Sequence, residues 1–215
     1  IQDLMDEEDD DLNVDSTVTV SDKELAVTGG LNADWINILL MGTDDRSGNM
    51  DSRTDSMIIV SINTKTSQVK MTSIMRDIWL EMYGGHTNRI NAANVYGGPN
   101  LAMRTVNEYF GMNIRQYALI NMQGLSNIID MLGGLDLDVT KGERKWINYY
   151  LNEYRNFTSS SSKDQNASGR SDLEAYGEST HLSGAQATAY CRIRYIGSDS
   201  QRTNRQRTVL TEMAH

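Results

Sequence analysis

The chain has 215 residues, 39% hydrophobic side chains and a formal net charge of −9. This length suits one domain with a sizeable core, and the single cysteine, Cys191, excludes an internal disulfide and a zinc site built on cysteines. No apolar run is long enough to span a bilayer, and the acidic balance argues against nucleic acid as a partner.

The charge is unevenly distributed along the chain. Residues 1–15 are rich in Asp and Glu and contain no Lys or Arg. Such a block is typical of a solvated linker, so we expect a linker segment at 1–15 and a single domain at 16–215. The other end is strongly basic. Its arginines are Arg192, Arg194, Arg202, Arg205 and Arg207.

Three short segments predict neighbouring strands. Segments 36–41 (INILLM) and 57–62 (MIIVSI) are apolar and bounded by turn residues, and 69–74 (VKMTSI) alternates as a strand with one polar face should. The polar residues 63–67 are typical of a hairpin turn. Short connections favour an antiparallel meander.

Charged residues follow or precede each of these strands. In a meander, Asp44, Asp55 and Arg76 would meet at one edge of the sheet, with Arg53 and Asp77 beside them. Carboxylates suit a hard divalent cation, and guanidinium groups match phosphate oxygens. The alternative is a set of surface salt bridges at the rim of the sheet.

The middle of the chain predicts further elements. We expect a small hairpin from 16–20 and 25–28, a strand at 78–82, a helix from 100 ending at Gly111, a strand at 117–121, a helix at 125–132 and a strand at 135–139. A polar insertion at about 141–180 contains scattered aromatic residues, with one or two helical turns at 146–154. It is either a lid over an apolar groove or a variable insertion.

The last third carries a second group of candidate residues. Ser183 is the expected N-cap of a helix, and Arg192 and Arg194 lie on one side of the chain if that stretch is extended. Arg202 and Gln206 share a helical face with Arg205. Cys191, between apolar residues, is expected in the core rather than as a nucleophile.

Several motifs together resemble the LytR-CpsA-Psr family of bacterial cell-envelope proteins. They are INILLMGTDDR, SRTDSMIIVSIN, SIMRDIWL, RINAANVYGG, INMQGLSNIIDMLGGLDLDV, LSGAQATAYCRIR and QRTNRQRTVL, in the order of the family and over roughly 34–213. The resemblance implies an α/β (α+β) fold with a central mixed, largely antiparallel sheet flanked by helices and an apolar groove for a polyprenyl chain.

The resemblance also implies an activity and a location. Family members transfer a glycopolymer, such as teichoic acid or capsular polysaccharide, from a polyprenyl pyrophosphate carrier to peptidoglycan. The chain would be the extracellular domain of a membrane-anchored protein, whose anchor lies outside this segment, in a Gram-positive bacterium. The resemblance thus implies that the linker at 1–15 is juxtamembrane and that the domain at 16–215 is catalytic. A Mg²⁺-dependent phosphotransferase is expected, with Mn²⁺ as the alternative ion and no nucleic acid as partner.

The family motifs assign roles to particular residues. Asp44 and Asp55 would hold the metal, and Arg53, Arg76 and Asp77 would be catalytic. The residues that would bind the pyrophosphate are Arg53, Arg76, Arg89, Arg192, Arg194, Arg202 and Gln206. The chain departs from the family in having Met75 where proline is frequent and Arg89 where many members have lysine.

Two competing functions use the same residues. A hydrolase would cleave the same pyrophosphate bond with water as the acceptor. A non-catalytic module for anionic glycopolymers or lipid phosphates would use the arginines alone, but paired carboxylates near the anion would weaken such binding.

Overall fold

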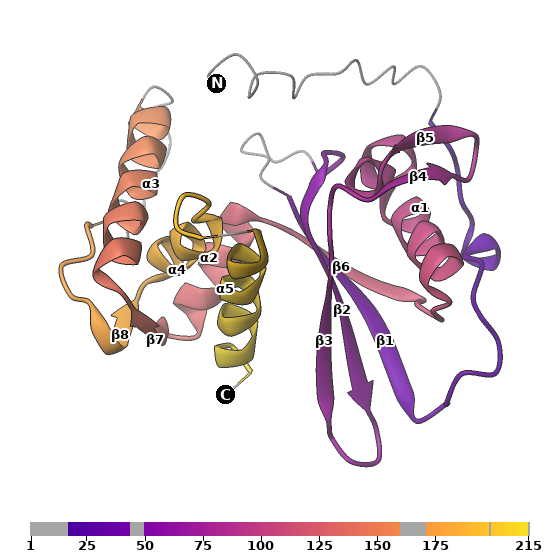
Figure 1. The fold of residues 1–215 in the computed structure, drawn as a ribbon, viewed down its shortest axis with the longest axis horizontal. Coiled ribbons are helices and arrows are strands. Elements are labelled where there is room, and N and C mark those ends of the chain that lie inside the picture. Colours follow the sequence, from indigo (N-terminus) through magenta and orange to yellow (C-terminus); the bar gives the residue numbers. More distant parts are fainter. Residues whose placement is uncertain (1–16, 44–49, 160–170, 198, 215) are drawn as a thin grey trace. The chain divides into compact units, whose positions relative to one another are not determined.

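The computed structural model describes residues 17–43, 50–159, 171–197 and 199–214 (Figure 1). The described residues form two compact units, 17–119 and 120–214. None of the helices in these ranges is long and apolar enough to cross a membrane.

A four-stranded sheet is the centre of the first unit. Its strands are β1 (Trp35–Thr43), β2 (Thr54–Asn63), β3 (Val69–Ile74) and β6 (Gln116–Asn121), in the order β3-β2-β1-β6. β1 pairs antiparallel with β2, and β2 pairs antiparallel with β3, with Met57 opposite both Met41 and Ile74. The predicted meander is therefore confirmed. β6, the strand predicted at 117–121, forms an edge of the sheet, and its first half is exposed.

The first unit also contains a helix and a small ribbon. These elements are β4 (Trp79–Met82), β5 (His86–Arg89), the short 3-10 helices η2 (Asp22–Glu24) and η3 (Ile90–Ala92), and α1 (Ala93–Phe110). α1 lies beside the sheet (Figure 1). Leu101 and Val106 of α1 are fully buried in the same cluster as Leu39 and Met57. Gly111 ends α1 in the left-handed conformation, as predicted.

The predicted hairpin at 16–28 is wrong. Its turn is η2, and the flanking segments bond to distant backbone rather than to each other: Val18 N–H donates to Tyr96 O at 2.7 Å and Thr28 N–H to Met112 O at 2.9 Å. α1 is kinked where this segment crosses it. A Cβ on Gly97 would lie 2.6 Å from Val18 O, so glycine permits the close approach.

The second unit is mainly helical. Its elements are α2 (Met122–Met131), β7 (Leu135–Val139), α3 (Lys141–Ser159), β8 (Gly177–Leu182), α4 (Gly184–Arg192) and α5 (Asp199–Glu212). β7 pairs antiparallel with β8. Ser183 caps α4 as predicted, accepting a hydrogen bond from Gln186 N–H. Cys191 is buried, and burial raises the pKa of its thiol to about 12, so it is an unreactive core residue as expected.

Helix α3 is much longer than the predicted turn or two at 146–154. Thr140 and Glu143 form a capping box: Thr140 Oγ1 accepts from Glu143 N–H, and the Glu143 carboxylate accepts from Thr140 N–H. Ile147 and Leu151, one turn apart, are buried in the core of the second unit. The capping box and this apolar stripe start and hold a helix within a polar stretch.

A buried ion pair joins α3 to α5. Arg205 Nε donates to Glu143 Oε1 at 2.9 Å, while the guanidinium also donates to Ile193 O at 3.1 Å and Ile196 O at 2.9 Å. The two side chains are only 7% and 12% exposed. Burial raises the pKa of Glu143, but the hydrogen bonds from Arg205 and Thr140 outweigh it and leave the pKa below its ordinary value.

We expect Asn107→Ala to destabilise the first unit. The Asn107 carboxamide donates to Leu25 O and Ile114 O and accepts from Ile114 N–H, at 2.8–2.9 Å, and is fully buried. Its loss leaves buried backbone groups unpaired, at a cost of roughly 2–4 kcal/mol in the free energy of unfolding. Urea denaturation measures this, with the exposed Asn127→Ala as control. Equal stability of the two variants would refute the role.

The Glu143 pair should make the stability of the second unit depend on pH. Because its folded pKa is lowered, its contribution is present above the unfolded pKa of about 4.3 and is lost as the pH falls through the folded value. Glu143→Gln should lower the free energy of unfolding by roughly 1–3 kcal/mol at neutral pH. Its urea midpoint should then fall less than that of the wild type between about pH 6 and pH 3. Glu178→Gln, an exposed change in the same unit, is the matched control for the loss of one carboxylate.

Candidate functional site

An alternating chain of acids and arginines lies at one edge of the first unit's sheet. Arg76 pairs with Asp55, and its Nε lies 3.7 Å from Asp77 Oδ2. Asp77 Oδ1 in turn lies 3.9 Å from Arg89 Nε. Asp55 and Arg76 are mostly buried, at 23% and 18% exposure, whereas Asp77 is half exposed. The structure thus brings four of the predicted residues into one network.

Strand pairing explains this arrangement. Met57 of β2 lies opposite Ile74 of β3. In the same antiparallel register, the position two residues before Met57 lies opposite the position two residues after Ile74, so Asp55 faces Arg76. Arg89 ends β5 and pairs with Trp79 at the start of β4, which follows Asp77 closely in the chain. Asn91 N–H also donates to Arg76 O at 3.3 Å. Two separate antiparallel pairs therefore position the network.

Asn94 holds the segment that leads into Arg53. Its Nδ2 donates to Met50 O at 2.7 Å and to Ser52 O at 2.8 Å, and the residue is 1% exposed. Sequence reasoning did not single out Asn94. The only signal was a polar residue within RINAANVYGG, at a position where the helix α1 faces the core.

Several buried oxygens at this edge have no hydrogen-bond partner among the described residues. They belong to residues at the start of β2 or to residues paired with or bonded to this edge: Thr43 Oγ1, Thr54 Oγ1, Ser52 Oγ, Asn91 Oδ1 and Asn94 Oδ1. Buried acceptors of this kind usually bind water or a ligand. This donor set is all oxygen and fits Mg²⁺, which keeps several of its waters and needs one or two carboxylates.

Only one of the two predicted metal ligands lies within the described residues. Asp55 is described above, but Asp44 lies outside the described residues. Within the described ranges, no three His, Cys, Asp or Glu side chains form a group that could hold a metal ion. The described ranges therefore contain no site that would coordinate a cation mainly through protein ligands. A hydrated ion that binds one or two carboxylates does not require such a site.

The second unit carries the other predicted arginines. Arg192 ends α4, so the extended stretch considered for Arg192 and Arg194 begins only after it. Arg194 is exposed in the connection to α5, and the Arg192 guanidinium lies 5.0 Å from the ring centre of Tyr150. Arg202 and Gln206 occupy α5, where Arg202 is 5% exposed.

Arg205, predicted on the same helical face as Arg202 and Gln206, has a structural role. Its guanidinium donates to Glu143, Ile193 and Ile196, which leaves little capacity for a ligand. Sequence reasoning had no means of separating it from its neighbours, since its partners come from α3 and from the connection that precedes α5.

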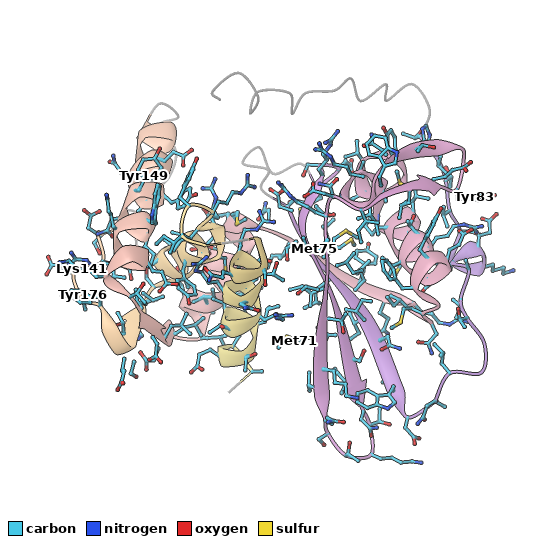
Figure 2. The ribbon with its side chains drawn as sticks, viewed as in Figure 1. Met71, Met75, Tyr83, Lys141, Tyr149 and Tyr176 are labelled. Atoms are coloured by element: carbon cyan, nitrogen blue, oxygen red, sulfur yellow. The ribbon has the colours of Figure 1, made fainter. Side chains whose placement is uncertain are left out.

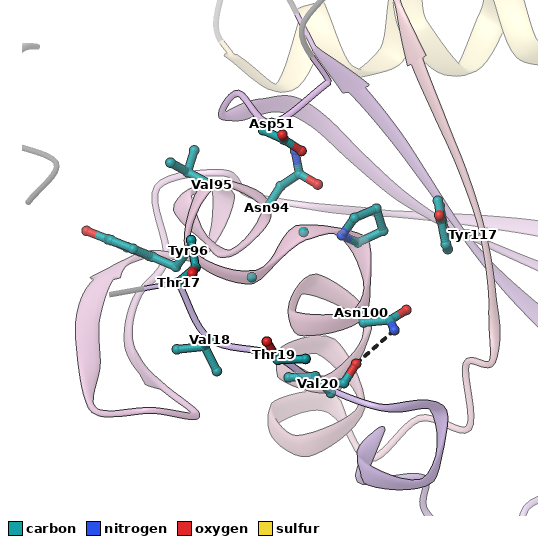
Figure 3. Close-up of a pocket in the computed structure, with 13 residues that line it drawn as sticks. Thr17, Val18, Thr19, Val20, Asp51, Asn94, Val95, Tyr96, Asn100 and Tyr117 are labelled. Atoms are coloured by element: carbon teal, nitrogen blue, oxygen red, sulfur yellow. Dashed lines mark hydrogen bonds between the residues drawn. The ribbon is translucent and has the colours of Figure 1, made fainter. Parts of the chain in front are cut away.

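A cavity of about 660 Å³ lies in the first unit (Figure 3). It is bounded by residues 17–20 and by the kink of α1, and Asp51 and Asn94 line it together with Tyr117. Asn100 Nδ2 donates to Val20 O at 2.9 Å and fastens the amino-terminal segment there. Asp51 and Asn94 connect the wall of this cavity to the segment preceding Arg53.

The LytR_cpsA_psr family model matches residues 4–215. The polyisoprenyl-teichoic acid–peptidoglycan teichoic acid transferase TagU of Bacillus cereus is 38% identical over 104 residues, which cover 48% of this chain and 34% of TagU. Biofilm regulatory protein A of Streptococcus mutans is 34% identical over 191 residues, covering 82% of this chain and 43% of that protein. The chain thus spans less than half the length of these curated relatives.

Solved structures agree with the family match. A structure of TagT bound to LI-WTA has a TM-score of 0.66 and 25% identity, covering 91% of this chain and 71% of that chain. B. subtilis TagV has a TM-score of 0.61 and 27% identity, covering 86% and 65%. The expected α/β fold, a central sheet flanked by helices, is thereby confirmed. Because the family model spans nearly the whole chain, with both groups of candidate residues, the chain belongs to the LytR_cpsA_psr family.

Proposed function

We propose that this domain transfers a glycopolymer from a polyprenyl pyrophosphate carrier to peptidoglycan. The observation that carries the proposal is the network of Asp55, Arg76, Asp77 and Arg89 at the sheet edge of a LytR_cpsA_psr protein. The names of relatives support it: TagU is a teichoic acid transferase acting on peptidoglycan, and TagT has been solved with LI-WTA and with octaprenyl pyrophosphate.

The reaction would be an in-line displacement at phosphorus. An acceptor hydroxyl of peptidoglycan attacks the phosphorus next to the glycan, a new P–O bond forms, and the P–O bond to the second phosphate breaks. Polyprenyl monophosphate leaves, and the hydroxyl proton passes to a base. Because charge builds up on the leaving phosphate, fixed guanidinium groups lower the barrier.

The proposal assigns the arginines of both units to binding of the pyrophosphate. Arg76, positioned by Asp55 and Asp77, and Arg53, next to the segment held by Asn94, would contact the pyrophosphate and orient it. Arg89 would add a further guanidinium through Asp77. In the second unit, the residues assigned to the pyrophosphate are Arg192, Arg194, Arg202 and Gln206.

Mg²⁺, or Mn²⁺ in its place, would be held by Asp44 and Asp55. The ion would neutralise phosphate charge. The unpartnered oxygens of Thr54 and Asn91 support this assignment, since they offer acceptors for water around the ion. Asp55 would then serve both the ion and Arg76, with which it is paired.

The names of the same relatives support a proposal about the location. TagU-type transferases act on the cell wall, so we propose an extracellular domain, tethered to the membrane by a segment outside residues 1–215 in a Gram-positive bacterium. Its partners would be the lipid-linked glycopolymer and peptidoglycan, and the polyprenyl tail would need an apolar groove.

Arg76→Ala and Asp55→Ala should each lower transfer by at least about 100-fold, because the charge stabilisation of the transition state is lost. The measurement is the transfer of labelled glycopolymer from a short-chain polyprenyl pyrophosphate donor to soluble peptidoglycan fragments, with circular dichroism to check folding. Lys65→Ala and Asp34→Ala are matched controls, because they remove an exposed ion pair of the same unit.

Wild-type transfer by either site variant would refute the site assignment. Phosphate release without attached polymer would instead identify a hydrolase. Tight binding of the donor with neither product would identify a binding module.

Removing divalent cations should abolish transfer, and adding Mg²⁺ or Mn²⁺ should restore it. Asp55→Asn should raise the Mg²⁺ concentration for half-maximal rate by at least about tenfold, because a charged ligand becomes neutral. A thermal shift on adding Mg²⁺ with geranyl pyrophosphate gives a second readout that requires no turnover. Undiminished activity in excess chelator would refute the metal assignment.

A further inference from the structure

Four aromatic side chains form a cluster on α3 and the connection between α4 and α5. The ring of Tyr195 stacks on Trp146, with centroids 4.5 Å apart and an interplanar angle of 22°. Trp146 also contacts Tyr149 edge to face at 5.3 Å, and Tyr149 contacts Tyr150 at 5.6 Å. We call Trp146, Tyr149, Tyr150 and Tyr195 the aromatic platform.

The platform has an inner and an outer part. Tyr150 is 7% exposed and Trp146 packs against the core of the second unit, whereas Tyr149 is 56% and Tyr195 67% exposed. Figure 2 shows Tyr149 on the side of α3. Since Trp146 occupies one face of Tyr195, the opposite face is the one open to solvent. Such rings offer a large rigid contact area, and their ordering costs little side-chain entropy.

Two arginines are built into the same surface. The Arg192 guanidinium stands 5.0 Å from the ring centre of Tyr150, and the Tyr150 hydroxyl hydrogen-bonds to the Arg194 backbone. Tyr195 follows Arg194 directly in the chain. Cationic groups and flat apolar faces are therefore held side by side within the second unit, by contacts among its own residues.

Guanidinium groups beside aromatic rings match the chemistry of a glycosyl phosphate. A glycosyl phosphate joins an anion to a pyranose ring, whose C–H groups make one face apolar. Guanidinium groups match the phosphate, and the apolar face can be buried against an aromatic ring. A polyprenyl chain fits less well, because half-exposed rings with hydroxyl groups leave much of it in water. Stacked rings with arginines also bind single-stranded nucleic acid, but the net charge of −9 opposes that ligand.

We propose that the aromatic platform binds the first sugar ring of the glycopolymer, the one attached to the pyrophosphate, with Tyr195 stacking on its apolar face. The proposal rests on the proposed function, because it takes Arg192 and Arg194 as pyrophosphate ligands. It adds a subsite that selects carriers bearing a sugar over bare polyprenyl pyrophosphate. Tyr149 borders the subsite and Trp146 supports the Tyr195 ring.

The test compares two soluble probes by isothermal titration calorimetry, with no acceptor present. They are geranyl pyrophosphate and geranyl-pyrophosphoryl-N-acetylglucosamine. The wild type should bind the sugar-bearing probe about threefold to tenfold more tightly, the scale of one aromatic contact. Tyr195→Ala should abolish that preference and leave binding of geranyl pyrophosphate unchanged. Tyr195→Phe should retain the preference, and Tyr149→Ala should reduce it.

Tyr83→Ala is the matched control. Tyr83 is 42% exposed, and the Arg104 guanidinium lies 3.8 Å from its ring centre, but it belongs to the first unit. This variant should keep the full sugar preference. Both tyrosines are substantially exposed, so neither change removes core packing.

The outcomes separate the subsite from the proposed function. A sugar preference that survives in Tyr195→Ala overturns the subsite, and so does a wild type that binds both probes equally. Both results leave the proposed function intact, because geranyl pyrophosphate still binds. A wild type that binds neither probe defeats the proposed function together with the subsite. A separate titration with soluble peptidoglycan fragments alone covers the acceptor: a Tyr195→Ala variant that loses affinity only for these fragments would place the acceptor on the platform and overturn the proposal.

Discussion

The pairing register of β2 and β3 is the constraint on which the candidate catalytic edge depends. Side chains alternate along a strand, so a slip of one residue would turn Asp55 and Arg76 to opposite faces of the sheet. The hairpin turn helps to set this register, because Asn63 Oδ1 accepts from the N–H groups of Lys65 and Thr66 at 3.0 and 2.9 Å. A local turn at one end of the hairpin thereby determines which charges meet at the other.

The hydrogen-bond partners of Arg205 give it a structural role among the arginines of the second unit, whereas Arg202, similarly buried at 5% exposure, is a proposed pyrophosphate ligand. A guanidinium group has five N–H donors, and burying it without acceptors is costly. Arg205 meets this requirement by donating to Glu143 and to two backbone carbonyls. Its guanidinium therefore stabilises the packing of α3 against α5. Arg194 stays exposed and Arg192 partly so. The same residue type, within fourteen positions, thus supplies a structural ion pair and candidate ligands for an anion.

The connection from Arg192 to Tyr195 links two of the proposed pyrophosphate ligands to the aromatic platform. Tyr150 is fixed by the core beneath it, and it holds both the Arg192 guanidinium and the Arg194 backbone. Any ligand that binds these arginines therefore lies next to rings whose positions are already set. If the proposed subsite is correct, one short segment and the helix α3 together recognise both the charge of the pyrophosphate and the apolar face of the sugar.

The sequence by itself determined the strands of the meander, because β-branched runs and period-2 alternation are local signals, and the family motifs named Asp55, Arg76, Asp77 and Arg89. It failed for the segment 17–28, whose backbone partners are Tyr96 and Met112, and underestimated α3, whose capping box went unrecognised. Only the tertiary structure decided the roles of Asn94 and Arg205. Their partners lie 42 and 62 residues away, and a buried polar side chain takes its role from whichever group satisfies it, which local sequence patterns do not encode.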